Sequence, residues 1–187
     1  MRNIYDSVSP LDFRYYGADA EIFERLSPYV SEAAFIKYQI KVERALLFAF
    51  SDFGWLSLDD KVLKALDSVT PEEVYEEEKR TGHIIRALVN CIVKRLSPEA
   101  GRFIHLFLTS ADITDTANSL RFQELVRDVI LPDLIELQGT LIGLARKHAD
   151  TPQIGRTHGC HAEPITFGFA MALYVDRLGS RIQALES

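Results

Sequence analysis

The sequence predicts an all-α fold, and three observations support this prediction. Apolar residues return every three to four positions in several stretches of the 187-residue chain, as they do in helices with one buried face. Strand signals are scarce, and glycine and proline number only 10 and 7. No internal repeat or low-complexity segment interrupts the pattern. With 47% hydrophobic residues, the chain has enough apolar side chains for a sizeable core.

The N-terminal stretch is predicted to contain a loop followed by helices. In Ser9–Gly17, turn formers mix with an arginine and two tyrosines without any period, which predicts a loop with available polar side chains. A helix follows and closes at Gly54, a residue suited to a C-cap. The apolar positions of that helix are Phe35, Tyr38, Val42, Leu46 and Phe50. A shorter amphipathic stretch occupies residues 58–69.

Thr70 and Pro71 mark the start of a further helix. Threonine is favoured at the N-cap, proline at the first helical position, and acids in the first turn, as found here. Gly82 interrupts this pattern before apolar positions resume at Ile84, and it leaves open whether one helix continues through both parts.

Two long helical patterns occupy the second half of the chain. The first spans residues 112–147, and Pro132 within it predicts a kink. The second spans residues 167–185 without a stop signal, so we expect the sequence to end inside a helix. Because an apolar stripe needs partner helices, we expect these stripes to pair between subunits or with helices outside these residues.

Charge and hydropathy exclude several functional classes. The formal net charge of −6 provides no general attraction for nucleic acid, although a few local arginines could still hold a small anionic substrate. No apolar run of membrane-spanning length and no signal-peptide pattern occur, so we expect a cytoplasmic protein without membrane contact. Cys91 and Cys160 lack a disulfide framework spacing and are expected to stay reduced.

The segment Gly155–Pro164 has the most unusual composition in the chain. Arg156, Thr157 and His158 could supply a charge, a hydroxyl donor and a proton-transfer group in one pocket. A metal site is a weaker alternative, since His158, Cys160 and His161 lack a second set of ligands at a recognisable spacing. A purely structural role for the histidines at a loop corner is the third interpretation.

A second polar cluster begins at His105 and continues to residue 116. Thr109 or Ser110 could cap the long helix, with Asp112 or Asp115 in its first turn. When this cluster is considered by itself, we favour that structural role. The functional alternative is a site for a substrate carboxylate at the helix N-terminus. Elsewhere, His83 at the Gly82 break is more typical of a cap or surface residue than of a catalyst.

Taken in order, three motifs resemble the adenylosuccinate lyase family of the fumarase/aspartase superfamily. Residues 9–15, SPLDFRY, resemble the opening loop of that family. Residues 109–117 resemble its TSxDxxDTA segment, and residues 155–168 resemble its GRTHxxHAxPxTFG segment. The resemblance covers essentially all 187 residues but less than half of a full-length family member.

The resemblance implies a domain organisation. It implies a small helical N-terminal domain, here 1–111, followed by the first long helices of a bundle, here 112–187, in which the central domain is truncated. It further implies a homotetramer for the full-length protein, with active sites built from three subunits.

The resemblance also implies a carbon–nitrogen lyase. The reaction is an anti β-elimination that releases fumarate from adenylosuccinate, leaving AMP, and from the succinylated aminoimidazole carboxamide ribotide of purine biosynthesis. It implies a small nucleotide substrate and neither cofactor nor metal. The elimination needs a base that removes the proton beside a carboxylate, donors that stabilise the anionic intermediate and an acid that protonates the leaving nitrogen.

By the same resemblance, His158 is the candidate general acid and His83 the second catalytic histidine. The family commonly has aspartate after the latter, whereas this chain has Ile84, which puts the tautomer of His83 in question. The implied phosphate-side residues are Arg14, Tyr15 and His105, and the implied carboxylate-binding residues are Thr109, Ser110 and Thr157. The family's general base is a serine in a GSSxMPxKxNP loop, which these residues lack, so we expect no useful turnover from this chain alone.

Two other classes remain open. Argininosuccinate lyase and other superfamily members share the general plan, although the motifs at residues 9–15 and 109–117 favour adenylosuccinate lyase. A non-catalytic helical oligomerisation module would explain the apolar stripes but not the polar clusters beside them.

Overall fold

The computed structural model describes residues 11–186 and divides into two compact units, one ending at Glu124 and the other beginning at Leu125. Ser9 and Pro10 of the opening motif lie outside the described residues. The predicted all-α fold is confirmed, since the described residues are helical apart from connections and one small sheet. The domain boundary at residues 111 and 112 stays a prediction.

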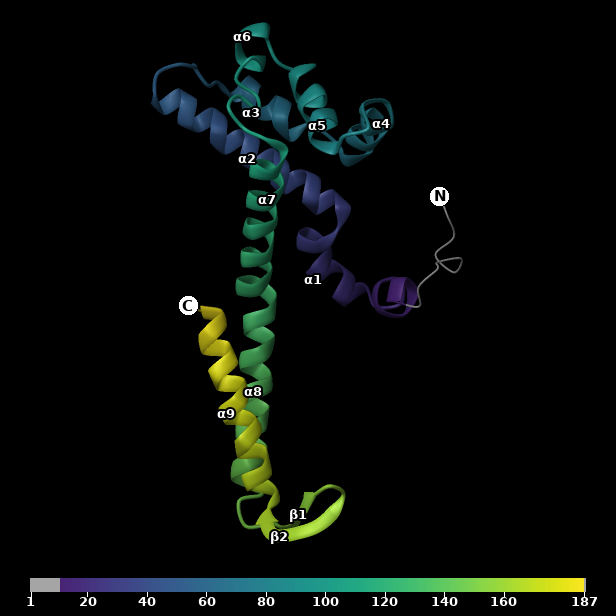
Figure 1. Cartoon of the computed structure of the whole chain (residues 1–187), viewed down its shortest axis with the longest axis vertical. Helices are drawn as coiled ribbons and strands as arrows, with labels where there is room; N and C mark the ends of the chain where they lie inside the picture. Colours follow the sequence, from purple (N-terminus) through teal and green to yellow (C-terminus); the bar gives the residue numbers. More distant parts are fainter. Residues whose placement is uncertain (1–10, 187) are drawn as a thin grey trace. The chain divides into compact units, whose positions relative to one another are not determined.

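The first unit contains helices joined by short connections (Figure 1). In chain order they are η2 (Asp12–Gly17), α1 (Ala20–Val30), α2 (Glu32–Asp52), α3 (Asp60–Asp67), α4 (Pro71–Thr81), α5 (Ile84–Val93), α6 (Pro98–Gly101) and α7 (Ser110–Leu125). The predicted loop at Ser9–Gly17 is wrong in its described part. A π-helical turn forms there, closed by the Ala18 N–H donating to the Phe13 carbonyl at 2.7 Å.

Local sequence signals set most of the helix ends. Thr70 accepts a hydrogen bond from the Glu73 N–H at 3.4 Å, which confirms the predicted start of α4. Gly54 and Gly82 both adopt positive φ, where a side chain would be strained, and each lies just after a helix. The break at Gly82 therefore separates α4 from α5.

The core of the first unit lies among α2, α3, α4 and α5, and it includes Ile113 from α7. Its largest fully buried apolar side chains are Ile36, Leu47, Leu66, Val74, Ile85, Leu88, Ile92 and Ile113. Helix α1, which contains Pro28 and has no buried residue, was not predicted from the sequence. The long α2 is the element against which α1, α3 and α4 all pack.

The second unit consists of η3 (Val126–Ile130), α8 (Leu131–Lys147), a hairpin of β1 (Pro152–Thr157) and β2 (Cys160–Thr166), and α9 (Phe167–Glu186). Helices α8 and α9 lie side by side (Figure 1). Both predicted long helical patterns are confirmed. The π-helical turn η3 comes just before Pro132, where the proline cannot donate a backbone hydrogen bond to the preceding turn.

The hairpin was not predicted from the sequence. Its strands pair antiparallel from Pro152 opposite Thr166 to Thr157 opposite Cys160, with an irregularity between Ile154 and Arg156. Most residues of both strands are exposed, so no buried face imposed an alternating pattern on the sequence. None of the helices in residues 11–186 has the length and apolar character needed to cross a bilayer.

Candidate functional site

His83 begins α5 and caps it with its ring. Its backbone is extended, with φ −154° and ψ 116°, and its Nδ1 accepts a hydrogen bond from the Arg86 N–H at 3.3 Å. A backbone N–H can only donate, so Nδ1 holds a lone pair. The neutral ring therefore carries its hydrogen on Nε2. The aspartate that the family motif places at the next position is not needed to select this tautomer.

Ser110, the first residue of α7, receives that hydrogen. The Nε2 atom of His83 lies 3.2 Å from the Ser110 hydroxyl oxygen, across 27 residues of sequence. Since Nε2 donates, the hydroxyl accepts, and its own hydrogen stays available for another acceptor. Ile113 and Ala117 are fully buried and anchor α7 in the first unit. The structure thus brings together two of the predicted site residues.

Thr109 forms hydrogen bonds with the first turn of α7. Its N–H and its hydroxyl both donate to one carboxylate oxygen of Asp112, at 2.7 and 3.0 Å. These hydrogen bonds hold the pKa of Asp112 below its usual value, and the bond from the Thr109 backbone has the larger effect. Asp112 thus accepts from the residue preceding the helix, as the acid of a capping box does, while the expected cap by the Thr109 or Ser110 hydroxyl stays a prediction.

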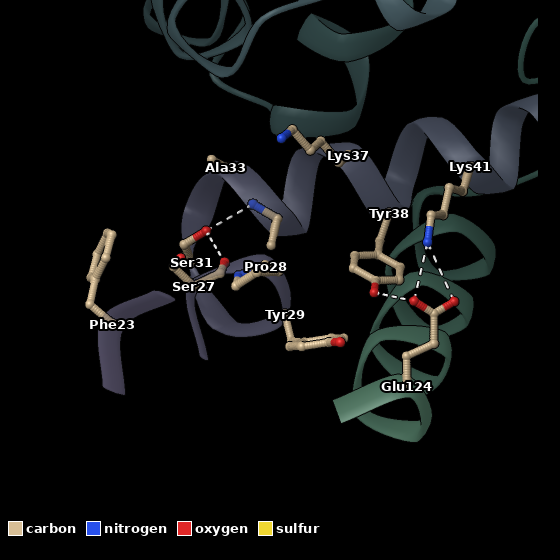
Figure 2. A pocket seen from close by; sticks show the side chains of 11 residues that line it. Phe23, Ser27, Pro28, Tyr29, Ser31, Ala33, Lys37, Tyr38, Lys41 and Glu124 are labelled. Atoms are coloured by element: carbon tan, nitrogen blue, oxygen red, sulfur yellow. Dashed lines mark hydrogen bonds and ion pairs between the residues drawn. The ribbon is translucent and has the colours of Figure 1, made fainter. Parts of the chain in front are cut away.

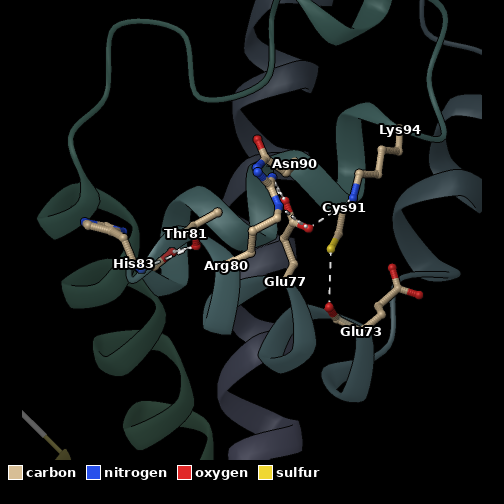
Figure 3. A network of polar contacts seen from close by, with 8 residues as sticks. All are labelled: Glu73, Glu77, Arg80, Thr81, His83, Asn90, Cys91 and Lys94. Carbon is tan, nitrogen blue, oxygen red and sulfur yellow. Dashed lines mark hydrogen bonds and ion pairs between the residues drawn. The ribbon is translucent and has the colours of Figure 1, made fainter.

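A polar network holds α4 and α5 together beside His83. Figure 3 shows Glu77 of α4 facing Arg80, Asn90 and Lys94. Asn90 Nδ2 donates to Glu77 at 2.8 Å and Lys94 Nζ at 3.2 Å, and Arg80 forms an ion pair with the same carboxylate. The hydrogen bond from Arg80, followed by that from Asn90, lowers the pKa of Glu77 to about 2. This network fixes the two helices that flank the His83 turn.

The turn itself is closed by Thr81. Its hydroxyl donates to the His83 carbonyl at 3.1 Å and accepts from the His83 N–H at 3.4 Å (Figure 3). Together with the cap on α5, these bonds orient the imidazole toward Ser110.

His105 lies in a strained segment before α7. Its φ is 59°, and that of Phe107 is 68°, a rare conformation for residues other than glycine. Glu43 of α2 accepts hydrogen bonds from the His105 N–H and from its Nδ1 atom, each at 2.9 Å. Burial raises the pKa of Glu43, and these hydrogen bonds oppose the rise.

Sequence reasoning missed Glu43, although a signal was present. Ile36, Ile40, Glu43 and Leu47 follow the four- and three-residue spacing of one helix face, and all four are buried. An acid in an apolar stripe is costly unless it has partners, so such a position indicates a paired carboxylate.

The remaining predicted residues lie on other elements. Arg14 and Tyr15 are exposed in η2 of the first unit. Thr157 and His158 belong to the second unit, where His158 and Gly159 form the turn of the hairpin with φ values of 51° and 77°. Such positive values are typical of two-residue hairpin turns. Residues 11–186 contain no cluster of three potential His, Cys, Asp or Glu metal ligands.

A cavity of about 610 Å³ opens between α1 and α2 in the first unit. Figure 2 shows Tyr38 and Lys41 converging on Glu124, with Lys41 Nζ 3.2 Å from a carboxylate oxygen. The lining of this cavity also includes Phe23, Tyr29 and Lys37. None of the predicted site residues lines this cavity, which therefore does not contribute to the arrangement around His83 and Ser110.

Comparison with known proteins places these residues in context. A family model described as Lyase matches residues 36–187. Adenylosuccinate lyase of Aquifex aeolicus is 37% identical over 154 residues, covering 79% of this chain and 34% of the relative. That of Pyrococcus abyssi is 34% identical over 186 residues, covering 96% of this chain and 39% of the relative. The chain thus spans little more than a third of the length of these relatives.

Solved structures give the same fold. A fumarate lyase from Mesorhizobium sp. BNC1 superimposes with a TM-score of 0.76 at 28% identity, covering 88% of this chain and 39% of that protein. A 3-carboxy-cis,cis-muconate lactonizing enzyme from Pseudomonas putida gives a TM-score of 0.71 at 30% identity, covering 83% and 37%.

Proposed function

The chain belongs to the Lyase family, whose model matches residues 36–187, and from this membership we propose that it forms part of an adenylosuccinate lyase. The proposed reaction is the anti β-elimination that releases fumarate from adenylosuccinate and from the succinylated aminoimidazole carboxamide ribotide of purine biosynthesis. The similarity to adenylosuccinate lyases of Aquifex aeolicus and Pyrococcus abyssi supports this substrate choice.

The observation that carries the proposal is the hydrogen bond between His83 and Ser110. Because the His83 ring donates through Nε2, the Ser110 hydroxyl is free to donate to an anion. Ser110 lies at the start of α7, where the dipole of a helix N-terminus also favours negative charge. A succinyl carboxylate is the ligand that this arrangement suits. Binding it stabilises the charge that develops as the neighbouring proton leaves.

The other proposed roles follow the motifs. His158 is the proposed general acid for the leaving nitrogen, because an imidazole can give up a proton near neutral pH. Thr157 and Thr109 would contact substrate carboxylates, and Arg14, Tyr15 and His105 the phosphate. Thr109 would have to release Asp112 to use its hydroxyl in this way. The general base is proposed to come from a serine loop that is not among these 187 residues.

The proposed setting is a cytoplasmic homotetramer that acts on a small nucleotide without a cofactor. Exposed apolar residues on α8 and α9, among them Leu137, Leu173 and Tyr174, support the pairing of these helices with further helices. The alternatives are another superfamily lyase, such as an argininosuccinate lyase, and a non-catalytic oligomerisation module.

The test is Ser110→Ala in a polypeptide extended through the serine loop, with fumarate release measured by steady-state kinetics. Removing a donor from a developing anion lowers kcat/KM by about 100-fold or more. Ser119→Ala removes an exposed hydroxyl from the same helix and should leave kcat/KM unchanged. The 187-residue chain alone should release no fumarate above background.

Two further measurements separate the alternatives. Offering adenylosuccinate and argininosuccinate side by side to the extended polypeptide identifies the substrate. Full activity of Ser110→Ala would contradict the proposed role of Ser110. No fumarate release by the wild-type extended polypeptide would favour the oligomerisation module. Loss of turnover with an unchanged oligomer, measured by light scattering, would support the lyase.

A further inference from the structure

Glu43 is a fully buried carboxylate in the middle of α2. Its side chain is 0% exposed, and its neighbours on the same helix face are Ile36, Ile40 and Leu47. A carboxylate in such surroundings loses its hydration and must be compensated by hydrogen bonds. The identity of its partners therefore reveals why an acid is present at this position.

Both oxygens of Glu43 are occupied by one residue. Oε2 accepts the His105 N–H at 2.9 Å, and Oε1 lies 2.9 Å from His105 Nδ1. The two residues are 62 positions apart in sequence. Because an ionised carboxylate can only accept, the hydrogen of the second bond belongs to Nδ1. The ring of His105 is thus held in the tautomer opposite to that of His83.

The hydrogen bond from the His105 N–H accounts for the unusual backbone conformation, whereas the bond to the ring Nδ1 requires a different explanation. The positive φ of His105 costs energy, and the bond from its N–H to Glu43 compensates for that strain. An acceptor for the N–H alone would be sufficient for this purpose. The bond to the ring orients a side chain that is still 21% exposed, and it leaves Nε2 as the ring nitrogen available to a ligand.

We propose that Glu43 is a positioning residue that holds His105 by its Nδ1–H and thereby presents Nε2 to an oxyanion of the substrate. A carboxylate behind an imidazole makes the opposite nitrogen more basic, as in carboxylate–histidine pairs at metal sites. An arriving anion is bound when Nε2 also carries a proton and donates it to the anion. The proposal rests on the proposed lyase function, which provides two oxyanions: a phosphate and a carboxylate.

A second feature supports an anion beside His105. Hydrogen bonds from Thr109 are the main cause of the lowered pKa of Asp112 in the first turn of α7, and an electrostatic contribution from His105 is the smallest. His105 therefore lies within electrostatic reach of the helix N-terminus that begins at Ser110. An anion there would meet both the imidazole and the N-terminal dipole of α7.

Glu43→Gln is a sharp test, because it nearly preserves shape. The amide oxygen can still accept the His105 N–H, but the amide NH₂ facing the ring can only donate. Nδ1 must then become the acceptor, and the hydrogen moves to Nε2. Two-bond ¹H–¹⁵N NMR spectra of the chain should show Nδ1 protonated in the wild type and unprotonated in the variant. His148, which contacts Thr151 in the second unit, is an internal control whose pattern should not change.

The kinetic arm uses the extended polypeptide and has to separate a positioning role from a merely structural one. We expect Glu43→Gln to raise KM about tenfold with a smaller change in kcat. Competitive inhibition by inorganic phosphate and by fumarate distinguishes the two oxyanions. Weaker inhibition by phosphate alone assigns Nε2 to the phosphate, and weaker inhibition by fumarate alone assigns it to a carboxylate.

Two outcomes would overturn the inference. One is an unprotonated Nδ1 in the wild-type chain, and the other is a Glu43→Gln variant with unchanged inhibition by both anions. Failure of this inference can be distinguished from failure of the proposed function. If adenylosuccinate is not a substrate, the wild-type enzyme releases no fumarate from it, whereas the NMR result still reports on the pair of Glu43 and His105.

Discussion

The two units of this chain differ in how much apolar surface each of them buries inside itself. In the first unit, apolar side chains from α2 to α7 enclose a continuous core. In the second unit, among the residues described, only Val129 and Ile182 are buried hydrophobic side chains. Large apolar side chains that remain exposed there are Ile135, Leu137, Ile154, Phe169, Leu173, Tyr174 and Leu185.

The second unit relies on close backbone approach. A Cβ atom on Gly168, the second residue of α9, would lie 2.5 Å from the Ala145 carbonyl oxygen and 2.7 Å from the Ala149 backbone. The Gly168 N–H donates to the His148 carbonyl at 2.9 Å at the same corner. A two-helix hairpin has too few partners to bury both of its apolar stripes. The comparison teaches that a long helix can be well formed locally and still lack a core.

Leu88→Ala should have the largest effect on stability, because Leu88 is fully buried in the first unit. Loss of the side chain and the resulting cavity should lower the free energy of unfolding by about 2–5 kcal/mol. Leu137→Ala makes the same change at an exposed site of α8 and should cost less than about 0.5 kcal/mol. Urea unfolding followed by far-ultraviolet circular dichroism reports on the helices of both units. Equal losses in both variants would contradict the comparison.

Gly168→Ala should have the second-largest effect on stability, and this effect should concern the second unit. The new methyl group has no room beside the Ala145 carbonyl, and the required shift should cost about 1–3 kcal/mol. Gly143→Ala on α8 is the matched control, since its Cβ would meet nothing within 4 Å. There alanine should stabilise the helix by up to about 1 kcal/mol. Hydrogen exchange at α8 and α9 measures both, and opposite signs are expected.

The smallest effect is expected at Glu77, whose partly buried carboxylate links α4 to α5 in the first unit. Its pKa falls from an ordinary value of 4.5 to about 2 in the folded chain. Its contribution to stability is therefore complete above pH 4.5 and is lost as the pH falls toward 2. The urea midpoint of Glu77→Gln should be lower than that of the wild type at neutral pH and should fall less on acidification. Glu76→Gln, at an exposed neighbouring acid, should titrate like the wild type.

The sequence was sufficient for most helices, because their signals are local. The Thr70 cap and both long helical patterns could be predicted from a few neighbouring residues, and Gly82 marked where a break was possible. The hairpin β1–β2 could not, since its exposed strands need no alternating pattern and depend on pairing and on the turn at His158. Its motif indicated chemistry without indicating the strand conformation.

The sequence by itself determined the helical class, several of the helix ends and the residue types of the candidate site. Only the tertiary structure decided which of those residues meet: His83 with Ser110 across 27 positions, and Glu43 with His105 across 62. It also decided the ring tautomer of His83, because the Arg86 N–H that meets Nδ1 can only donate. A helix is specified by side chains three to four residues apart, whereas these contacts arise only when distant helices pack around a common core.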